Sequence, residues 1–406
     1  MTALTLTNVR PWGGDPVDLT IRDGVIAAIG PVGADRAAAT DLLDGRGRVL
    51  LPSFSDVHVH LDSTRIGLPF RPNSVGPERT LAACIENDRR NWRSAGASVA
   101  ERATETLGRA IGHGLTLARS YAQVDADCRL ERLEGVLAAR EAHADRAEVQ
   151  VVAFPQAGLL LEPGVPDLID EALRAGAEVV GGIDPCGLDR DPVRHLDVVF
   201  ELAERHDAAI DIHLHEPGEL GLFSAGLVLD RVRAHGLRSR VTLAHAFCLG
   251  GSPMDRVAPV LDAIAELDVA LTTVAPGPRE GLPVRAILDR GIRLGLGQDG
   301  QRDYWSPYGT TDMLDRTWQL AFTQGWSRDE DVEVGLAVAT VGGRRVVDPS
   351  TDRSTPLARG AGTGVGDPAD LVLVTGDNAT AAVMDRAGDR TVVRRGRVVA
   401  DRGVLR

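Results

Sequence analysis

Short apolar segments alternate with helix-like segments through the middle of the chain. Eight runs rich in β-branched and other apolar residues are predicted to be strands, at residues 49–60, 115–121, 149–156, 178–184, 208–215, 240–246, 269–275 and 292–299. The intervening segments predicted to be helices include residues 78–111, 130–144, 167–175, 192–205, 219–234, 253–266 and 284–290. Apolar strands that alternate with helices form parallel sheets covered by helices. Eight such repeats predict an α/β fold, the (β/α)8 TIM barrel. No GxGxxG motif follows the first of these strands, which removes the dinucleotide-binding alternative.

Both ends of the chain have a different pattern. Polar and apolar residues alternate at residues 4–9, 17–29, 371–374 and 390–400, as in antiparallel strands with one solvated face. Neither end supplies enough strands to bury a core alone, so we expect them to pair into one small β-sandwich. The predicted domains are this sandwich, from residues 1–49 and 357–406, and the barrel at residues 50–356. Residues 349–366, rich in Gly, Ser and Thr, are predicted to form a loop.

The first predicted barrel strand ends in two histidines, His58 and His60. Residues two apart on a strand point to the same side, so both imidazoles are expected to face the same way. A divalent metal ion satisfies two neighbouring imidazoles that are costly to leave unpaired. An isolated HxH sequence is equally compatible with a histidine pair that binds no metal. The residues at the other strand ends therefore decide between the two interpretations.

The chemistry of such a barrel lies at the carboxyl ends of its strands. Polar residues also end several of the other predicted strands, namely Gln156, His213, His215, Glu216, His245 and Asp299. Five of the ten histidines therefore gather with one aspartate on a single face, and the other five fall on predicted helices or helix ends. This convergence predicts a metal site.

The residue types at this face narrow the metal and the reaction. Imidazoles with one carboxylate and no thiolate suit Zn²⁺, Fe²⁺ or Mn²⁺ and disfavour Ca²⁺ and Mg²⁺. Three or four protein ligands leave a position for water, whose pKa a catalytic metal lowers to about 7. Asp299, Glu216 and His245 would be its acid and base partners. The pattern predicts metal-assisted hydrolysis, and spacing does not choose between His213 and His215 as a ligand.

Composition restricts the partners and the number of metal ions. The net charge of −13 disfavours nucleic acid and anionic membranes, and no run of about 18 apolar residues is present. A start without a secretion signal and four cysteines without a CxxC motif predict a cytoplasmic protein with reduced thiols. All 45 basic residues are arginine. Without lysine, neither a Schiff base nor a carboxylated lysine that bridges two metals can form.

The same residues resemble the amidohydrolase superfamily over essentially the whole chain. The shared pattern is HxH after the first strand, single histidines after the fifth and sixth strands, an aspartate after the eighth, and a sandwich from both termini. Within the superfamily the chain resembles cytosine deaminases, most specifically in the Phe-Pro-Gln-Ala-Gly sequence of residues 154–158. The absence of lysine agrees, because the two-metal branches need a carboxylated lysine after the fourth strand.

The resemblance implies one divalent metal ion, Zn²⁺ or Fe²⁺, with Mn²⁺ as a further option. Its implied ligands are His58, His60, His213 and Asp299. Asp299 would also take a proton from the water at the metal and pass it to the departing ammonia.

The resemblance also implies how the substrate is bound. Gln156 would hydrogen-bond the ring edge, and Glu216 would protonate a ring nitrogen. His245 would orient the nucleophile or polarise the substituent of the reacting carbon. Trp305, just past Asp299, is expected on the pocket wall.

Two positions depart from the cytosine deaminase pattern. Gly300 stands where the pattern has a second aspartate, and Gln298 stands where it usually has histidine. Losing a carboxylate at position 300 would remove a charge and a side-chain volume from the pocket wall. We therefore expect the pocket to accept a larger or 5-substituted ring.

The predicted function is metal-dependent hydrolytic deamination of an aminated N-heterocycle, with cytosine or a 5-substituted cytosine such as 5-methylcytosine as the first choice. The same site would serve deamination or N-dealkylation of triazines, deamination of isocytosine, or hydrolysis of a cyclic amide. An inactive scaffold is the remaining alternative. The expected partner is a small heterocyclic substrate. A homo-oligomer is compatible with the sequence, which marks no interface.

Overall fold

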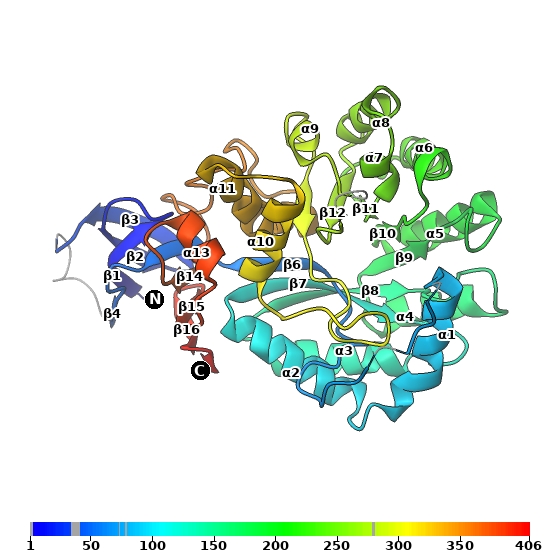
Figure 1. Ribbon diagram of the computed structural model, residues 1–406, viewed down its shortest axis with the longest axis horizontal. Helices are drawn as coiled ribbons and strands as arrows, with labels where there is room; N and C mark the ends of the chain where they lie inside the picture. Colours follow the sequence, from blue (N-terminus) through cyan, green and yellow to red (C-terminus); the bar gives the residue numbers. More distant parts are fainter. Residues whose placement is uncertain (1–2, 34–40, 73, 78, 278–280) are drawn as a thin grey trace.

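The computed structural model describes residues 3–33, 41–72, 74–77, 79–277 and 281–406. Its larger part is a barrel of eight parallel strands with helices around it (Figure 1). The strands, in their order around the barrel, are β6 (Phe54–Val59), β7 (Leu115–Gln123), β8 (Glu148–Phe154), β9 (Val179–Ile183), β10 (Ala209–His213), β11 (Val241–Ala244), β12 (Ala270–Thr273) and β13 (Leu294–Leu296). Each overlaps one of the eight predicted strands, so the predicted barrel is confirmed.

The barrel closes where β6 meets the segment that follows β13. Val59 pairs in parallel with Asp299, and the Asp299 amide donates a hydrogen bond of 2.7 Å to the carbonyl of His58. A Cβ atom at Gly297 would lie 2.6 Å from that carbonyl oxygen, so only glycine permits this approach. Closure therefore places the first predicted metal ligands beside the last one.

Helices connect the strands and cover the barrel. They are α1 (Leu81–Asn91), η2 (Trp92–Ser94), α2 (Val99–Gly112), α3 (Glu131–Ala142), α4 (Val165–Ala175), α5 (Pro192–His206), α6 (Gly218–His235), α7 (Phe247–Gly251), α8 (Met254–Glu266), α9 (Val284–Leu288), α10 (Met313–Thr323), α11 (Asp329–Ala337), the π-helix η3 (Val338–Gly342), α12 (Gly343–Val347) and α13 (Ala379–Asp385). Among the described residues, no helix is both long enough and apolar enough to cross a membrane.

The predicted helix at residues 78–111 is wrong in one respect, because it consists of separate helices. α1 and η2 end before α2 begins, and Gly96 between them adopts a φ of 86°. The hydroxyl of Ser98 accepts a hydrogen bond from the Glu101 amide, while the Glu101 carboxylate accepts one from the Ser98 amide. This capping box defines a new helix start. Residue 78 lies outside the described residues.

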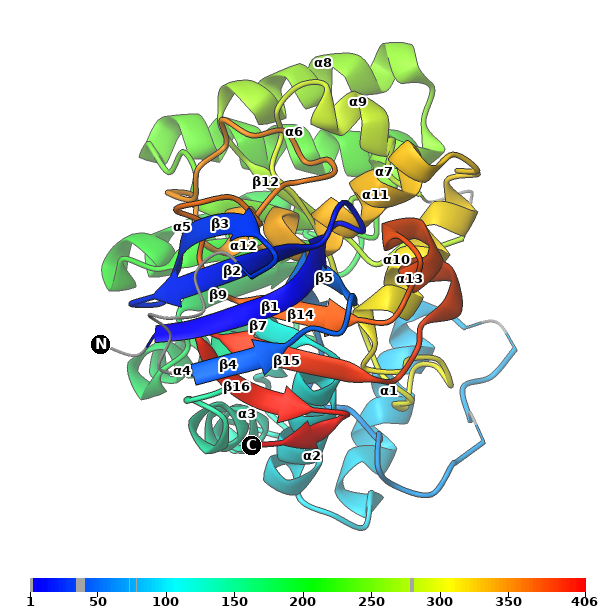
Figure 2. The same cartoon turned by 90° about the vertical axis from the view of Figure 1, so that its left-hand side faces the viewer.

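Both chain termini build the second sheet, which lies across one end of the barrel (Figure 2). Its strands are β1 (Ala3–Pro11), β2 (Val17–Arg22), β3 (Val25–Pro31), β4 (Asp41–Asp44), β5 (Val49–Pro52), β14 (Leu371–Val374), β15 (Arg390–Arg394), β16 (Arg397–Asp401) and β17 (Val404–Leu405). β14 pairs antiparallel with β5, which joins the two ends of the chain. Leu6, Ile21, Leu373 and Val393 share one buried core, so strands far apart in this sheet pack on each other as expected for a sandwich.

The predicted strand at residues 49–60 is two strands in different sheets, which corrects that prediction. The Ser53 amide donates to the carbonyl of Asp370 in the terminal sheet at 2.9 Å. The next amide, of Phe54, donates to the carbonyl of Gly114 beside the barrel at 2.9 Å. The chain therefore passes from one sheet to the other without a loop. Because the apolar run is unbroken here, the sequence pattern does not show where one strand ends and the next begins. The predicted loop at residues 349–366 contains no helix or strand, as expected.

Candidate metal centre and substrate cavity

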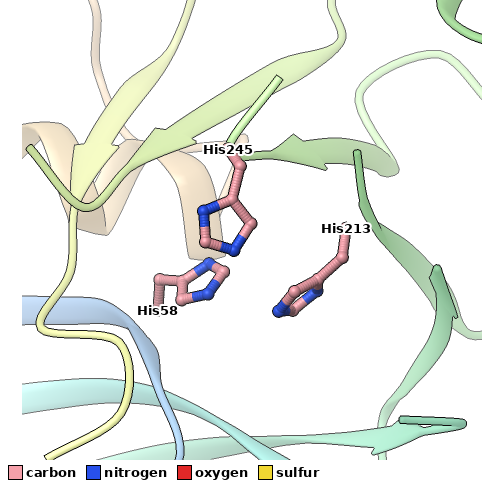
Figure 3. A group of neighbouring side chains, drawn as sticks. All are labelled: His58, His213 and His245. Atoms are coloured by element: carbon pink, nitrogen blue, oxygen red, sulfur yellow. The ribbon is translucent and has the colours of Figure 1, made fainter. Parts of the chain in front are cut away.

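Side chains from four barrel strand ends turn toward one point. His58, His213 and His245 each offer a ring nitrogen within 4.8 Å of the others (Figure 3). His58, His60 and Asp299 form a second group of this kind, with Oδ1 of Asp299 3.4 Å from Nε2 of His60 and 3.7 Å from Nε2 of His58. His58 belongs to both groups, so they define one centre. The structure thus brings together all four predicted ligands and adds His245 within reach.

The protonation of these side chains fits a divalent cation. Nε2 of His58 is buried and has no hydrogen-bond partner among the described residues. Nε2 of His213 lies only 3.4 Å from Nε2 of His60. Burial lowers the pKa of His58 to about 4 and the pKa values of His213 and His245 well below their usual range. Neutral, closely spaced imidazoles beside a carboxylate are a ligand set suited to Zn²⁺ or Fe²⁺.

Asp299 is the anionic member of the centre. Burial alone would raise its pKa, but the surrounding imidazoles of His58, His245 and His60 outweigh burial and hold the pKa well below its usual range. The backbone of Asp299 has a φ of 64° and that of His245 a φ of 62°. Residues other than glycine rarely adopt this left-handed conformation, and such strain is concentrated at functional sites.

The structure separates the two histidines between which spacing could not choose. β10 ends at His213, whose ring is directed at the centre, whereas His215 lies beyond the strand. Nδ1 of His215 is 2.7 Å from Oδ2 of Asp184, and His215 is in neither ligand group. Burial disfavours its charged form, but the Asp184 carboxylate outweighs burial and raises the pKa of His215. This geometry favours His213 as the ligand.

Buried polar side chains contact His58 at Nδ1, the ring nitrogen on the far side from the centre. Tyr121 lies 3.0 Å from Nδ1 of His58 and donates a hydrogen bond of 3.0 Å to Asp211, which also accepts one of 2.8 Å from Arg119. The sequence carried a signal for Tyr121, because it ends a predicted strand in the same way as the ligands do. Phenols are not among the usual ligands of these metals, so this position does not stand out as part of a metal site.

A cavity of about 380 Å³ opens over the centre. His60, His213 and Asp299 line it. Four of the five residues predicted to bind substrate also belong to its wall, namely Gln156, His245, Gly300 and Trp305. A cavity of this size suits a small ring with a short substituent.

Glu216, the fifth residue predicted to bind substrate, is not part of the described cavity wall. Its Oε1 atom accepts hydrogen bonds from the amides of Cys186 at 2.8 Å and Gly187 at 2.5 Å, and its Oε2 atom accepts one from the Ser224 hydroxyl. Burial raises the pKa of this carboxyl, although these donors oppose the effect. These hydrogen bonds thus fix the carboxylate of Glu216 outside the described cavity wall.

The space beside Gly300 is occupied, which corrects our inference that the wall lacks a carboxylate. A Cβ atom at position 300 would overlap Oδ2 of Asp303. Asp303 lines the cavity, and its carboxyl stands where a side chain at position 300 would begin. A carboxyl group and its volume are thus present at this point of the wall, supplied by a residue three positions further along the chain. Sequence reasoning missed Asp303 because it lies in a loop, where no periodicity fixes side-chain direction.

The fold and the centre define a metal-dependent hydrolase of the amidohydrolase type. Residues 41–400 match the model of the amidohydrolase family, and the chain belongs to that family. The crystal structure of N-isopropylammelide isopropylaminohydrolase from Burkholderia multivorans ATCC 17616 superposes with a TM-score of 0.90 at 37% identity, covering 100% of both chains.

Two further proteins resemble the chain over most of its length. The N-isopropylammelide isopropyl amidohydrolase of Pseudomonas sp. (strain ADP) is 28% identical over 369 residues, which cover 90% of this chain and 89% of the relative. The 5-methylcytosine deaminase of Klebsiella pneumoniae, liganded with 5-fluorocytosine, superposes with a TM-score of 0.80 at 24% identity over 98% of this chain and 97% of its own. The second likeness shows a shared fold. The predicted enzyme class, a hydrolase acting on C–N bonds, is confirmed.

Proposed function

We propose that this enzyme hydrolyses the exocyclic C–N bond of an amino- or alkylamino-substituted oxo-heterocycle, a triazine or a pyrimidine. The observation that carries the proposal is the shared cavity, in which three candidate ligands, His60, His213 and Asp299, face the same space as the amide of Gln156. A planar ring with its amine-bearing carbon over the centre presents an edge to Gln156. An amide, which both donates and accepts hydrogen bonds, suits the N–H and C=O groups of such an edge.

We propose that His58, His60, His213 and Asp299 hold one divalent ion, Zn²⁺ or Fe²⁺. Such an ion, when bound, lowers the pKa of water so that a hydroxide nucleophile is supplied near neutral pH. The neutral state of the buried histidines supports this ligand set, because they need not lose a proton first.

The remaining chemistry belongs to side chains of the cavity. Asp299, held ionised by the surrounding imidazoles, accepts the proton of the attacking water and passes it to the departing amine. His245, kept neutral by burial, donates a hydrogen bond toward the substituents of the reacting carbon. Glu216, whose pKa is raised by burial, delivers a proton to the ring nitrogen once it leaves Ser224, and it regains one from the new hydroxyl as the reacting carbon becomes a carbonyl.

Two substrates are candidates, and they differ in the amine that leaves. An N-alkylamino triazine is the first, because the full-length neighbour at 37% identity is named for N-isopropylammelide. Cytosine or a 5-substituted cytosine is the second, supported by the sequence of residues 154–158 and by the Klebsiella neighbour. The four cysteines are free, which supports our further proposal that the enzyme works in the reducing cytoplasm.

The test is amine release from a panel of rings by protein loaded separately with Zn²⁺, Fe²⁺ or Mn²⁺. The panel contains N-isopropylammelide, ammelide, cytosine, 5-methylcytosine, isocytosine and a cyclic amide. We expect isopropylamine or ammonia from at least one aminated ring, and its identity decides between the candidates. Asp299→Asn should abolish release, whereas Asp315→Asn, a half-exposed carboxylate on α10, should not. Stoichiometrically loaded protein that releases no amine from any ring contradicts the proposal.

A further inference from the structure

Asp303 connects two loops at the mouth of the barrel. Its Oδ1 atom accepts hydrogen bonds from the backbone amides of Trp305 at 2.8 Å and Ser306 at 3.0 Å. Its Oδ2 atom accepts one from the hydroxyl of Ser63 at 3.2 Å, and Ser63 lies just past β6. Three donors from two segments therefore fix the plane of the carboxyl, with Oδ2 beside Gly300.

The carboxyl of Asp303 faces the cavity without a cationic partner. Asp303 and Ser63 both line the cavity, and Asp303 is only 9% exposed. Arg132 lines the same cavity, but its guanidinium is engaged by Asp88 at 2.5 Å and by Asp62 at 3.4 Å. Within the described part of the chain, no arginine or histidine forms an ion pair with Asp303. Burial raises the pKa of Asp303 to about 7, as expected for a carboxyl without such a partner.

In the ionised carboxyl, Oδ2 keeps an unused lone pair after Ser63 has donated, so it can accept a hydrogen bond from a substrate. Gln156 follows β8, whereas Asp303 follows β13, on a different side of the barrel. The two side chains therefore meet different edges of a ring placed between them. In cytosine the reacting carbon is flanked by one nitrogen and one C–H group. In an oxo-triazine such as ammelide it is flanked by one nitrogen and one N–H group.

We propose that Asp303 is a specificity-determining residue that accepts a hydrogen bond from the ring N–H beside the reacting carbon, and so selects oxo-triazines over pyrimidines. This inference rests on the proposed function and names the ring class within it. A pyrimidine places a C–H group against Oδ2, which leaves the buried acceptor without a donor from the ring. An unmet hydrogen bond to a charged or polar buried group is a strong basis for rejection.

The substitution Asp303→Asn tests the acceptor with little change in volume. The amides of Trp305 and Ser306 require an oxygen at the Oδ1 position, so the NH₂ group of asparagine must take the Oδ2 position. A donor then meets the N–H of the triazine. We expect the ratio of kcat/KM for ammelide to that for cytosine to fall about 10- to 100-fold. Gly300→Ala should lower the same ratio, because its methyl group displaces the carboxyl without altering Asp303.

Binding of two unreactive rings provides a readout independent of turnover. Cyanuric acid carries N–H groups all round, whereas uracil has a C–H group at position 5. Calorimetry on zinc-loaded wild-type enzyme should give tighter binding of cyanuric acid, and Asp303→Asn should remove most of this preference. Asp315→Asn is the matched control and should leave both ratios unchanged. Zinc content and circular dichroism verify that each variant is folded and loaded.

The outcomes separate this inference from the proposed function. If wild-type enzyme releases amine but Asp303→Asn and Gly300→Ala keep both ratios, Asp303 does not select the ring and the proposed function stands. If wild-type enzyme releases no amine yet binds cyanuric acid in an Asp303-dependent manner, the selection stands and the proposed reaction fails. Protein that neither binds nor converts any ring overturns both.

Discussion

The phenol oxygen of Tyr121 lies 3.0 Å from Nδ1 of His58, on the opposite side of the imidazole from the candidate metal centre. Burial raises the pKa of Tyr121 well above its usual value, so the phenol keeps its proton and donates a hydrogen bond to Asp211. The phenol oxygen is then free to accept the Nδ1 proton of His58. This chain of hydrogen bonds fixes the tautomer whose Nε2 lone pair faces the centre.

Replacing Tyr121 by phenylalanine should weaken metal binding without removing any ligand. The Nδ1 proton of His58 would lose its nearer acceptor and keep only the Thr272 hydroxyl at 3.4 Å, and loss of such a supporting contact typically reduces metal affinity by roughly 10- to 100-fold. Competition with a zinc chelator measures the dissociation constant. Tyr308→Phe, at a tyrosine that is 75% exposed, serves as the control. An unchanged zinc affinity in Tyr121→Phe would show that the phenol does not orient the ligand.

His213 and His215 should differ in their effect on metal content. His213→Ala removes an imidazole that lies 3.4 Å from His60 in the centre, and we expect purified protein to lose most of its zinc. His215→Ala removes a ring whose Nδ1 atom is paired with Asp184, and zinc should remain stoichiometric. Elemental analysis of both variants decides the matter. The reverse result would assign the ligand to His215.

The imidazoles of His58 and His213 should stay neutral well below pH 6.5, so protons should not displace zinc from these two ligands near neutral pH. Burial lowers the pKa of His58 from 6.5 to about 4 and lowers that of His213 well below 6.5. A lowered histidine pKa means that the neutral, metal-binding form persists at lower pH. Titration of the imidazole resonances of metal-free protein by nuclear magnetic resonance, from pH 4 to 8, measures both pKa values. A midpoint near pH 6.5 for either ring would contradict this expectation.

A side chain at position 297 should open the barrel at its closure. Gly297→Ala would place Cβ 2.6 Å from the carbonyl oxygen and 2.7 Å from the amide nitrogen of His58. We expect a loss of about 3 kcal/mol in the free energy of unfolding, as for an overpacked core, together with loss of zinc. Gly226→Ala is the control, because a Cβ there meets nothing within 4 Å and lies in α6. The control should stabilise the protein by about 0.5–1 kcal/mol in urea titration. Equal stability of wild type and Gly297→Ala would refute the closure argument.

The eight barrel strands could be read from the sequence because each is a short apolar run between helical segments. The residues at the strand ends were informative too, because parallel strands in a barrel place their carboxyl ends on one face. His58, His60, His213 and Asp299 were therefore identified together although they are scattered over more than half of the chain. Helices α10–α13 were not predicted, because they follow the last barrel strand and the repeat of strand and helix ends there.

The sequence by itself determined the barrel, the paired termini and the residue types that gather at the candidate metal centre, because periodicity and strand ends are local properties. Only the tertiary structure decided that residues 49–60 divide between two sheets and that Asp303 occupies the space beside Gly300. It also decided that Glu216 is held by Cys186, Gly187 and Ser224. Each of these depends on a loop conformation or on a hydrogen-bond partner brought near by folding. Hydrophobic periodicity does not encode such contacts, because they depend on how loops bend and on which segments pack beside them.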